Sequence, residues 1–460
     1  MKRAFLSTLI IGQGLLLSAC FTTAQDLSGD APTAPQAWSA YQSDTVDVLD
    51  AQGGAESLKG WWKRFDDPTL DALIEMALAG NPDRKIAQAR IAEARGIART
   101  ATGGLFPQVG LSGQKGRSDS GSGAADNFYD AGFDASFELD LFGGNRAASR
   151  AADAGTQAAE ANYDHASLSL IAEVGRSYIE YRSAEKQTRI ALKNLEIQDR
   201  TLGLIRNQRT SGEATQLDTE RAENLVNTTR SSIPEYQRQG DQARLRLAVL
   251  TGNMPDGVVA LLETQADIPG ADLRPVLMAP ASVIAQRPDI RAAAAMLAAS
   301  TDNVTAANAE IFPSVNVSGL YGIANSALIN TASVWSIAIG AAVNLIDFGR
   351  IRGRIDTAEA RQIQSFETYR KTILEAVSEV EGALADYARI NESRQSLVKA
   401  SGNAQRALNL SRQLFDEGEV SFLDVLDAQR TVNQAESDLI SAESAQSQSL
   451  IRLYKALGVY

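Results

Sequence analysis

The chain has almost none of the residues on which most catalytic and metal sites depend. Its 460 residues include one histidine, His165, and one cysteine, Cys20. These counts exclude a disulfide within the chain and any metal site built from several Cys or His ligands. The sequence also has no Walker A loop, no dinucleotide-binding glycine pattern and no Gly-x-Ser-x-Gly elbow. We therefore expect no enzyme, no catalytic residue, no cofactor and no metal.

Positive charge and aromatic side chains are also scarce. There are 44 Lys and Arg against 56 Asp and Glu, which gives a net charge of −12. Binding to the phosphate backbone of a nucleic acid requires clustered basic residues. The excess of acidic residues therefore argues against nucleic acid as a partner. Aromatic residues make up 6% of the chain, and long stretches consist of alanine and polar helix-forming residues. This composition favours long helices over a compact enzyme.

The amino terminus has the pattern of a targeting segment. Lys2 and Arg3 precede an apolar stretch over residues 4–17, which is the layout of a signal peptide. The stretch ends in Leu17-Ser18-Ala19-Cys20, which resembles a bacterial lipobox. That resemblance implies removal of residues 1–19, acylation of Cys20 with lipid such as palmitate, and sorting to the outer membrane. Residues 20–57, rich in Ala, Pro, Ser, Asp and Gly, are predicted to form a lipidated extended tether.

An internal repeat with an offset of 206 residues defines the organisation of the chain. The matched landmarks include Asn81-Pro82-Asp83 with Arg287-Pro288-Asp289, Phe106-Pro107 with Phe312-Pro313, Phe142-Gly143 with Phe348-Gly349, Gly212-Glu213 with Gly418-Glu419, and Gly252 with Gly458. No gap is needed over about 170 residues, which helical similarity alone does not explain. The pattern predicts a first structural repeat over residues 58–252, a connector over 253–286 and a second repeat over 287–458.

Four stretches alternate between apolar residues and small or polar ones. They lie near residues 107–115, 130–140, 313–322 and 334–345. Strands of about 10 residues with this alternation are typical of membrane β-strands around a wet lumen, although an antiparallel sandwich is the alternative. Open sheet edges are not tolerated in lipid, and four strands cannot close a barrel. Three chains would give a closed barrel of twelve strands.

The remaining residues predict long helices. Leading helices are expected over about 82–103 and 288–310, and long helical hairpins over 145–252 and 350–457. A proline-free helix of 67 residues spans roughly 100 Å, which indicates a coiled-coil-like wall. Pro234 should interrupt and kink the returning helix of the first hairpin. The fold class is therefore a mixed α and β membrane protein with a tandem repeat.

Several motifs, taken in order, carry a resemblance to a known family. They are Trp61-Trp62-x-x-Phe65-x-Asp67-Pro68, Asn81-Pro82-Asp83, Leu139-Asp140-Leu141-Phe142-Gly143, Arg287-Pro288-Asp289-Ile290, Asp347-Phe348-Gly349-Arg350 and Asp424-Val425-Leu426-Asp427-Ala428-Gln429-Arg430. With this spacing the chain resembles the TolC/NodT-type outer-membrane efflux factors, in their lipoprotein branch. The resemblance implies a homotrimer with a β-barrel in the outer membrane and an α-helical tunnel in the periplasm. It also implies two partners, a periplasmic membrane-fusion adaptor and an inner-membrane transporter.

The two hairpin tips are the first candidate site. Glycine stands where one helix should end, and Thr215 with Asp218, or Ser421 with Asp424, has the spacing of a helix cap. Capping alone is one interpretation of the tips. The resemblance adds that they contact the adaptor, through Gly212, Glu213, Ala214, Thr215, Gly418, Glu419, Val420 and Ser421.

The second candidate site follows the second tip. The resemblance implies that Leu423, Asp427 and Arg430 form a periplasmic gate, and we add Asp424 and Asp218 to it. Spacings of three and four residues place these side chains on shared helix faces. Three copies would bring two carboxylates each, from Asp424 and Asp427, to one axis. We therefore expect a mostly closed channel that prefers cations.

Three functions remain open at this point. The favoured one is the exit duct of a resistance-nodulation-division-type tripartite pump that exports small toxic compounds. The second is the exit duct of a type I protein secretion system, which uses the same architecture. The third is a structural helical lipoprotein that bridges the envelope layers, against which the alternating strands argue.

Overall fold

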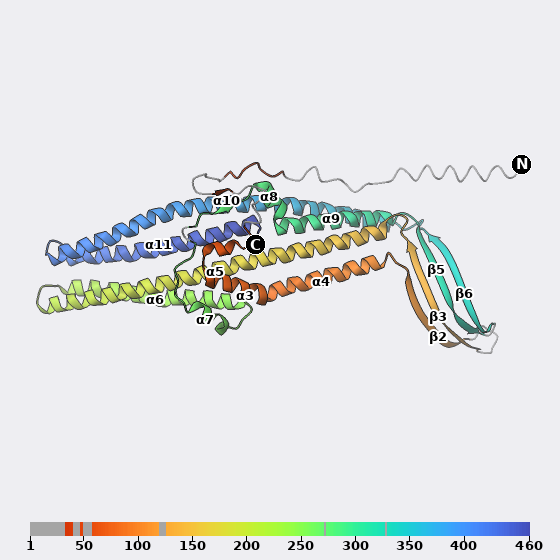
Figure 1. Ribbon diagram of the computed structural model, residues 1–460, viewed down its shortest axis with the longest axis horizontal. Helices are drawn as coiled ribbons and strands as arrows, with labels where there is room; N and C mark the ends of the chain where they lie inside the picture. The colour runs from red at the N-terminus through yellow and green to blue at the C-terminus, as the bar shows by residue number, and fades with distance from the viewer. Residues whose placement is uncertain (1–32, 40–46, 49–57, 119–125, 271–272, 327–328) are drawn as a thin grey trace. The chain divides into compact units, whose positions relative to one another are not determined.

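The computed structural model describes residues 33–39, 47–48, 58–118, 126–270, 273–326 and 329–460 (Figure 1). The signal peptide over residues 1–19 and Cys20 lie outside these ranges. The described chain divides into two compact units, each of which takes segments from both repeats. Unit 1 contains residues 89–161 and 291–372, and unit 2 contains residues 33–88, 162–290 and 373–460 with the gaps given above.

Unit 1 contains an antiparallel sheet of four strands. These are β2 (Gln108–Ser118), β3 (Asp126–Leu139), β5 (Ser314–Ser326) and β6 (Ile329–Ala342), in the order β2-β3-β5-β6. All four predicted strands are present. They are longer than predicted at the ends next to the β2–β3 connection and the β5–β6 connection. β6 ends at Ala342, three residues before the expected end.

The two faces of this sheet differ because side chains alternate along each strand. Large apolar side chains share one face, in cross-strand rows such as Leu111, Phe133, Tyr321 and Trp335, followed by Val109, Ala135, Gly319 and Ile337. Small and polar side chains dominate the other face, in rows such as Gln108, Ser136, Ser318 and Ala338, followed by Gly110, Asp134, Leu320 and Ser336. We call these the apolar face and the polar face.

The helices repeat with the same offset as the sequence. The leading helices are α4 (Pro82–Gly103) and α9 (Pro288–Ala309), the long helices are α5 (Gly144–Thr210) and α10 (Arg350–Asp416), and the returning helices are α6 (Gln216–Leu250) and α11 (Phe422–Leu457). Each long helix has 67 residues, as expected. Among the described residues no single helix is long and apolar enough to cross a membrane; only α6 taken with Pro255–Leu262, at a bend of 99°, passes by length and composition.

The predicted interruption at Pro234 is wrong, because α6 continues through this residue from Gln216 to Leu250. A proline removes one backbone hydrogen bond from a helix but does not end a helix that tertiary packing holds in place. The flanking Thr229 and Ile233 are both buried and supply such packing.

A core of aromatic side chains organises unit 2. The helical turn η3 (Trp61–Phe65) leads into α3 (Pro68–Gly80), and the ring of Trp61 stacks on Tyr454 of α11 with centroids 5.2 Å apart. The Asp67 carboxylate caps α3 by accepting hydrogen bonds from the backbone N–H groups of residues 69 and 70. It also accepts from the Tyr178 hydroxyl at 2.8 Å, and this hydroxyl accepts from the fully buried Arg182.

The tether and the connector meet in unit 2. The connector forms η4 (Pro255–Val258), α7 (Val259–Leu262), β4 (Val276–Leu277) and α8 (Pro280–Gln286). Two residues of the predicted tether, β1 (Asp47–Val48), pair in parallel with β4. Trp38 is buried and donates a hydrogen bond from its indole N–H to the carbonyl of Met278 at 2.8 Å. The described part of the tether is therefore extended but docked on the connector, which the sequence did not predict.

In each repeat, the residue that precedes the leading helix is bonded to the end of the returning helix. Asn81 donates from its side-chain amide to the carbonyl of Leu250, at 2.9 Å, near the end of α6. Arg287 donates to the carbonyl of Ala456 at 2.8 Å, and Ala456 stands 206 residues after Leu250. Arg287 is also bonded to Asp289 and Glu379, at 2.6 and 2.8 Å. The start of each leading helix is thereby attached to the end of its returning helix.

The buried guanidinium of Arg287 gives a test of this closure. Arg287→Met removes its bonds to Ala456, Asp289 and Glu379 and should lower the free energy of unfolding by about 1.5–3 kcal/mol, as for hydrogen bonds to charged groups. Thermal unfolding in detergent, followed by circular dichroism, measures the loss. In the control Arg352→Met the lost pair with Asp356 is exposed, so a change within about 0.5 kcal/mol is expected. Equal losses in the two variants would contradict the proposed closure.

Candidate channel entrance at the hairpin tips

Both hairpin tips begin with the same helix-ending turn. At the end of α5, the N–H of Glu213 donates to the carbonyl of Gln208 and that of Gly212 donates to Arg209. At the end of α10, Glu419 donates to Leu414 and Gly418 to Phe415. This is the Schellman pattern, which requires a left-handed residue at the glycine position. Gly212 has φ +83° and Gly418 has φ +76°, so the sequence uses glycine where a side chain would strain the backbone.

The next helix of each tip begins with the predicted cap. The Asp218 carboxylate accepts hydrogen bonds from the backbone N–H and the hydroxyl of Thr215, at 3.0 and 2.6 Å. The Asp424 carboxylate accepts the corresponding bonds from Ser421, at 2.9 and 2.7 Å. The capping predicted from the sequence is thus confirmed at both tips. It also means that the charge of Asp424 is already engaged within its own helix turn.

The bonds at Thr215 affect the acidity of Asp218. The hydrogen bond from the Thr215 side chain, followed by the bond from its backbone N–H, stabilises the carboxylate and holds the pKa of Asp218 below its usual value of 3.8. The cap therefore requires the ionised form of the carboxyl group.

A hydrophobic core shared by the two hairpins lies behind the tips. Residues of α5 and α6 contribute to it together with Phe422, Val425 and Leu426 at the start of α11. Ion pairs and hydrogen bonds further along also join the hairpins, among them Lys186 to Glu443 at 2.9 Å and Asn194 to Glu436 at 2.9 Å. The first turns of α11 therefore have one buried face within the chain.

Four of the predicted gate residues lie on the opposite face of these turns. We call Leu423, Asp424, Asp427 and Arg430 the tip face. All four are exposed, and the side chains of Asp427 and Arg430 form an ion pair at 3.7 Å that is about 70% exposed at each end (72% and 68%). Arg430 also lines a polar cavity of about 350 Å³ between α5, α6 and α11, with neighbours such as Asn194, Asn224 and Thr228. The structure thus brings the gate residues of the second repeat together on one uncovered surface.

The first repeat has a matching surface that sequence reasoning covered only at Asp218. Moving Leu423, Asp427 and Arg430 back by 206 residues gives Leu217, Arg221 and Asn224, all of which are exposed. The repeat offset alone could have found them. The two tips thus share a leucine and a capping aspartate. They differ in charge, because Arg221 and Asn224 stand in the first repeat where Asp427 and Arg430 stand in the second.

No competing site stands out in the part of the chain that the structure describes. Within the ranges given above, no three or more His, Cys, Asp or Glu residues are placed to hold a metal ion. His165 lies partly buried on α5, and burial lowers the pKa of its imidazole. Its surroundings are those of helix packing.

Comparison with known proteins decides the family. The family model described as outer membrane efflux protein matches residues 73–253 and again 279–459, which correspond to the two repeats. The chain belongs to the outer membrane efflux protein family. The two separate matches also support the tandem repeat found from the sequence.

Individual relatives agree with this assignment over nearly their full length. The chain is 32% identical over 470 residues to the pyoverdine export outer membrane protein OpmQ of Pseudomonas aeruginosa, with 98% of this chain and 96% of that protein covered. It is 30% identical over 454 residues to the cation efflux system protein CusC of Escherichia coli K12, with 96% and 97% covered. The solved structure of the outer-membrane channel OprN superposes with a TM-score of 0.83 at 32% identity, covering 94% of this chain and 99% of that one.

These comparisons confirm the fold and the channel function that the resemblance implied. The chain has the TolC-like fold, with four strands and long helices per chain, and it is an outer-membrane channel of tripartite efflux pumps rather than an enzyme. The family consists of trimeric channels that extend from the outer membrane into the periplasm. The roles of the individual tip residues remain predictions.

The cap at Asp218 predicts a pH-dependent tip. Because its folded pKa is depressed, its contribution to stability is fully present above the unfolded value of 3.8 and is lost as the pH falls through the lower folded value. Amide protection over residues 216–219, corrected for intrinsic exchange rates, should therefore drop below about pH 3.8. Asp218→Asn is the control and should show no such step. Equal protection of the unaltered chain at pH 3 and pH 6 would contradict the prediction.

Proposed function

We propose that three copies of the chain close a twelve-stranded β-barrel in the outer membrane and continue it as a helical tunnel into the periplasm. The duct takes small toxic compounds from an inner-membrane transporter through a periplasmic membrane-fusion adaptor that contacts the hairpin tips. The observation that carries the proposal is the tip face. Leu423, Asp424, Asp427 and Arg430 are exposed although the opposite side of the same helix turns is buried.

The charge of the tips suits a docking surface for an adaptor. The second tip carries Glu417 and Glu419 beside its glycine, whereas the first carries Glu213 alone. In a trimer these tips alternate, so an adaptor meets three strongly acidic tips and three weakly acidic ones. Both tips are built from the same turn and cap, and such a fixed backbone lowers the entropy lost on binding.

The cargo follows from the character of the duct. The polar face of the sheet carries mostly small and polar side chains, with the Asp134 carboxylate among them. OpmQ is named for pyoverdine export and CusC for cation efflux, so similar channels serve different cargoes. The transporter then selects the compound, and the channel regulates passage.

The gate can be tested through the residues that the caps leave free. In a trimer the Asp427 carboxylates lie around one axis, and a ring of like charge attracts cations. Asp427→Asn should therefore lower the cation preference of the channel in planar bilayers. Arg430→Ala removes the partner of Asp427 and should raise the conductance, because the ring of side chains loosens. Block by divalent ions should weaken in Asp427→Asn.

The matched control lies on α6. The exposed Asp241 and the half-buried Arg244 form a pair with the same spacing of three residues, at 3.3 Å, well beyond the tip. Asp241→Asn and Arg244→Ala should leave selectivity, block and conductance unchanged. If the tip variants behave like these controls, the gate assignment is wrong and Asp427 and Arg430 only solvate the helix.

Lipid attachment at Cys20 is the remaining part of the proposal. The Leu17-Ser18-Ala19-Cys20 sequence supports cleavage before Cys20 and acylation of its sulfur. Mass spectrometry of the mature amino-terminal peptide should find an acylated cysteine as the first residue. Cys20→Ser should abolish the modification and leave the signal uncleaved at this site. An unmodified peptide that begins elsewhere would contradict the lipid anchor.

A further inference from the structure

The sheet ends on both sides in a strand with an unpaired edge. Within the described residues, β3 and β5 each pair on two sides, whereas β2 pairs only with β3 and β6 only with β5. We propose that β6 pairs with β2 of a neighbouring copy in the register that β3 and β5 adopt within the chain, and that Phe348 stacks on Phe106 of that copy. The proposal rests on the trimer proposed above and specifies the contacts that close it.

The repeat fixes strand register where it can be checked. In the first repeat, Gln108 of β2 pairs with Ser136 of β3. Moving both by 206 residues gives Ser314 and Ala342, and these are paired in β5–β6. The two hairpins therefore have the same register as far as Ala324, beyond which β5–β6 is irregular, so along this stretch the offset that relates the sequences also relates the hydrogen-bonded pairs.

The same operation predicts the contact between copies. β3 pairs with β5 through Leu139 with Val315 and Phe133 with Tyr321. Moving the β3 residues forward and the β5 residues back by 206 gives Leu345 with Val109 and Ile339 with Lys115. Since both strands of the second set are sheet edges, the pairs can only form between copies. The pairs in between are Val343 with Leu111 and Ala342 with Ser112.

The early end of β6 supports this register. The last three residues of β3, Phe137–Leu139, pair with β5 alone, because β2 begins opposite Ser136. Their counterparts are residues 343–345, which lie outside β6 in the chain. Leu345 is 88% exposed and Val343 is 48% exposed. In the proposed contact these residues gain β2 of the neighbour as their partner, so β6 lengthens to Leu345.

Side-chain chemistry matches across the proposed contact. Val343 and Leu345 would lie beside Leu111 and Val109 on the apolar face. Ala342 would lie beside Ser112 on the polar face. A slip of one residue would place apolar side chains on the polar face along the whole strand, which disfavours that register.

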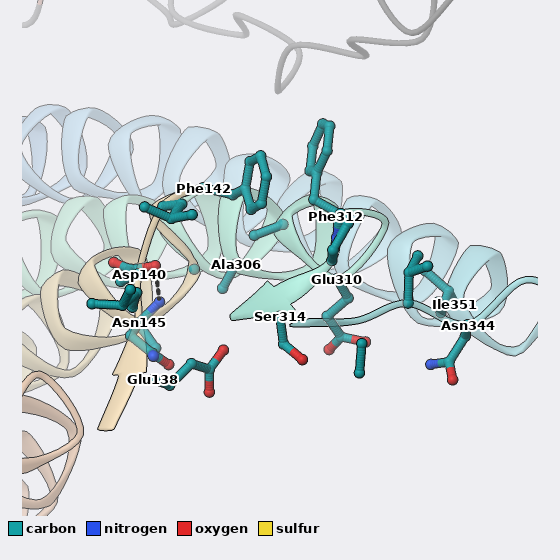
Figure 2. Close-up of a pocket in the computed structure, with 18 of the residues that line it drawn as sticks. Glu138, Asp140, Phe142, Asn145, Ala306, Glu310, Phe312, Ser314, Asn344 and Ile351 are labelled. Atoms are coloured by element: carbon teal, nitrogen blue, oxygen red, sulfur yellow. Dashed lines mark hydrogen bonds between the residues drawn. The ribbon is translucent and has the colours of Figure 1, made fainter. Parts of the chain in front are cut away.

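A pair of phenylalanines supports the same assignment. Phe142 follows β3 and stacks on Phe312, which precedes β5, with ring centroids 4.5 Å apart and planes at 12° (Figure 2). The counterparts are Phe348, which follows β6, and Phe106, which precedes β2. Phe348 is 99% exposed and has φ +54°, which is uncommon for a residue other than glycine. Phe106 is exposed as well, so both rings are available to a neighbouring copy.

Disulfide trapping tests the register. Opposed residues in an antiparallel pair alternate between closer and wider spacing, so one pair on each face is used. The first variant combines Ser112→Cys with Ala342→Cys, and the second combines Leu111→Cys with Val343→Cys. Mild oxidation of each purified protein should yield a covalent trimer that reduction dissolves. The unaltered chain controls for Cys20.

The matched control combines Ser112→Cys with Ala338→Cys. Ala338 lies on the same face four residues from the predicted partner, about 13 Å along the strand, which is beyond the reach of a disulfide. Light scattering, corrected for detergent, gives the oligomeric state of each variant. A trimer whose cross-linking is strongest with Gly340→Cys or Asn344→Cys in place of Ala342→Cys overturns the register but not the trimer. A monomer overturns both.

The stacked rings have a separate test. Phe348→Ala and Phe106→Ala should each speed the dissociation of the trimer on heating by about 2–10-fold, as expected for one aromatic pair. The double variant should dissociate no faster than the faster single variant, because both changes break one contact. Effects that multiply in the double variant would show that the two rings do not meet.

Discussion

An unpaired backbone N–H or C=O group in hydrocarbon costs several kcal/mol, and this constraint governs the four-stranded sheet. β3 and β5 satisfy it within the chain, but β2 and β6 have one free edge each among the described strands. No rearrangement of four strands with one apolar face removes both edges. In the proposed trimer, pairing between copies removes both edges and at the same time turns the polar face inward. On this proposal the trimer and its polar duct follow from the same shortage of strand partners.

The duplication lets the chain use each contact twice. The residue before the leading helix is bonded to the returning helix in both repeats, Asn81 to Leu250 in the first and Arg287 to Ala456 in the second. The tips share their turn, and the hairpins share their register. In the proposed trimer, three copies would then give a nearly sixfold wall from a threefold assembly. The places where the repeats differ, such as Asp427 against Arg221, are where the assembly becomes truly threefold.

Much of this arrangement could be predicted because its determinants are local. Glycine, proline and capping residues fix the helix ends at Pro82, Gly212 and Ser421, and alternation identifies the strands. Long-range packing accounts for what was missed. α6 tolerates Pro234 because its neighbours bury the flanking residues, and Trp38 docks on a carbonyl 240 positions away. The buried Arg182 donates to Tyr178 on its own helix, and Tyr178 in turn donates to Asp67 of the α3 cap, 111 positions away, which no local pattern encodes.

The caps also restrict how the entrance can open. Melting a tip would break the Schellman bonds and the Ser421–Asp424 cap and expose Phe422 and Val425, which belong to the buried core. Exposed pairs such as Asp427 with Arg430, which lie on the same helix, contribute only about 0–1 kcal/mol each, so rearranging side chains on the tip face costs less than melting the tip. Separating the two hairpins of one chain would expose the same core, so in the proposed gate each tip stays folded and both hairpins of a copy move together. In the proposed channel a folded tip then remains in contact with the adaptor in both states, so that docking and opening do not compete for the same backbone.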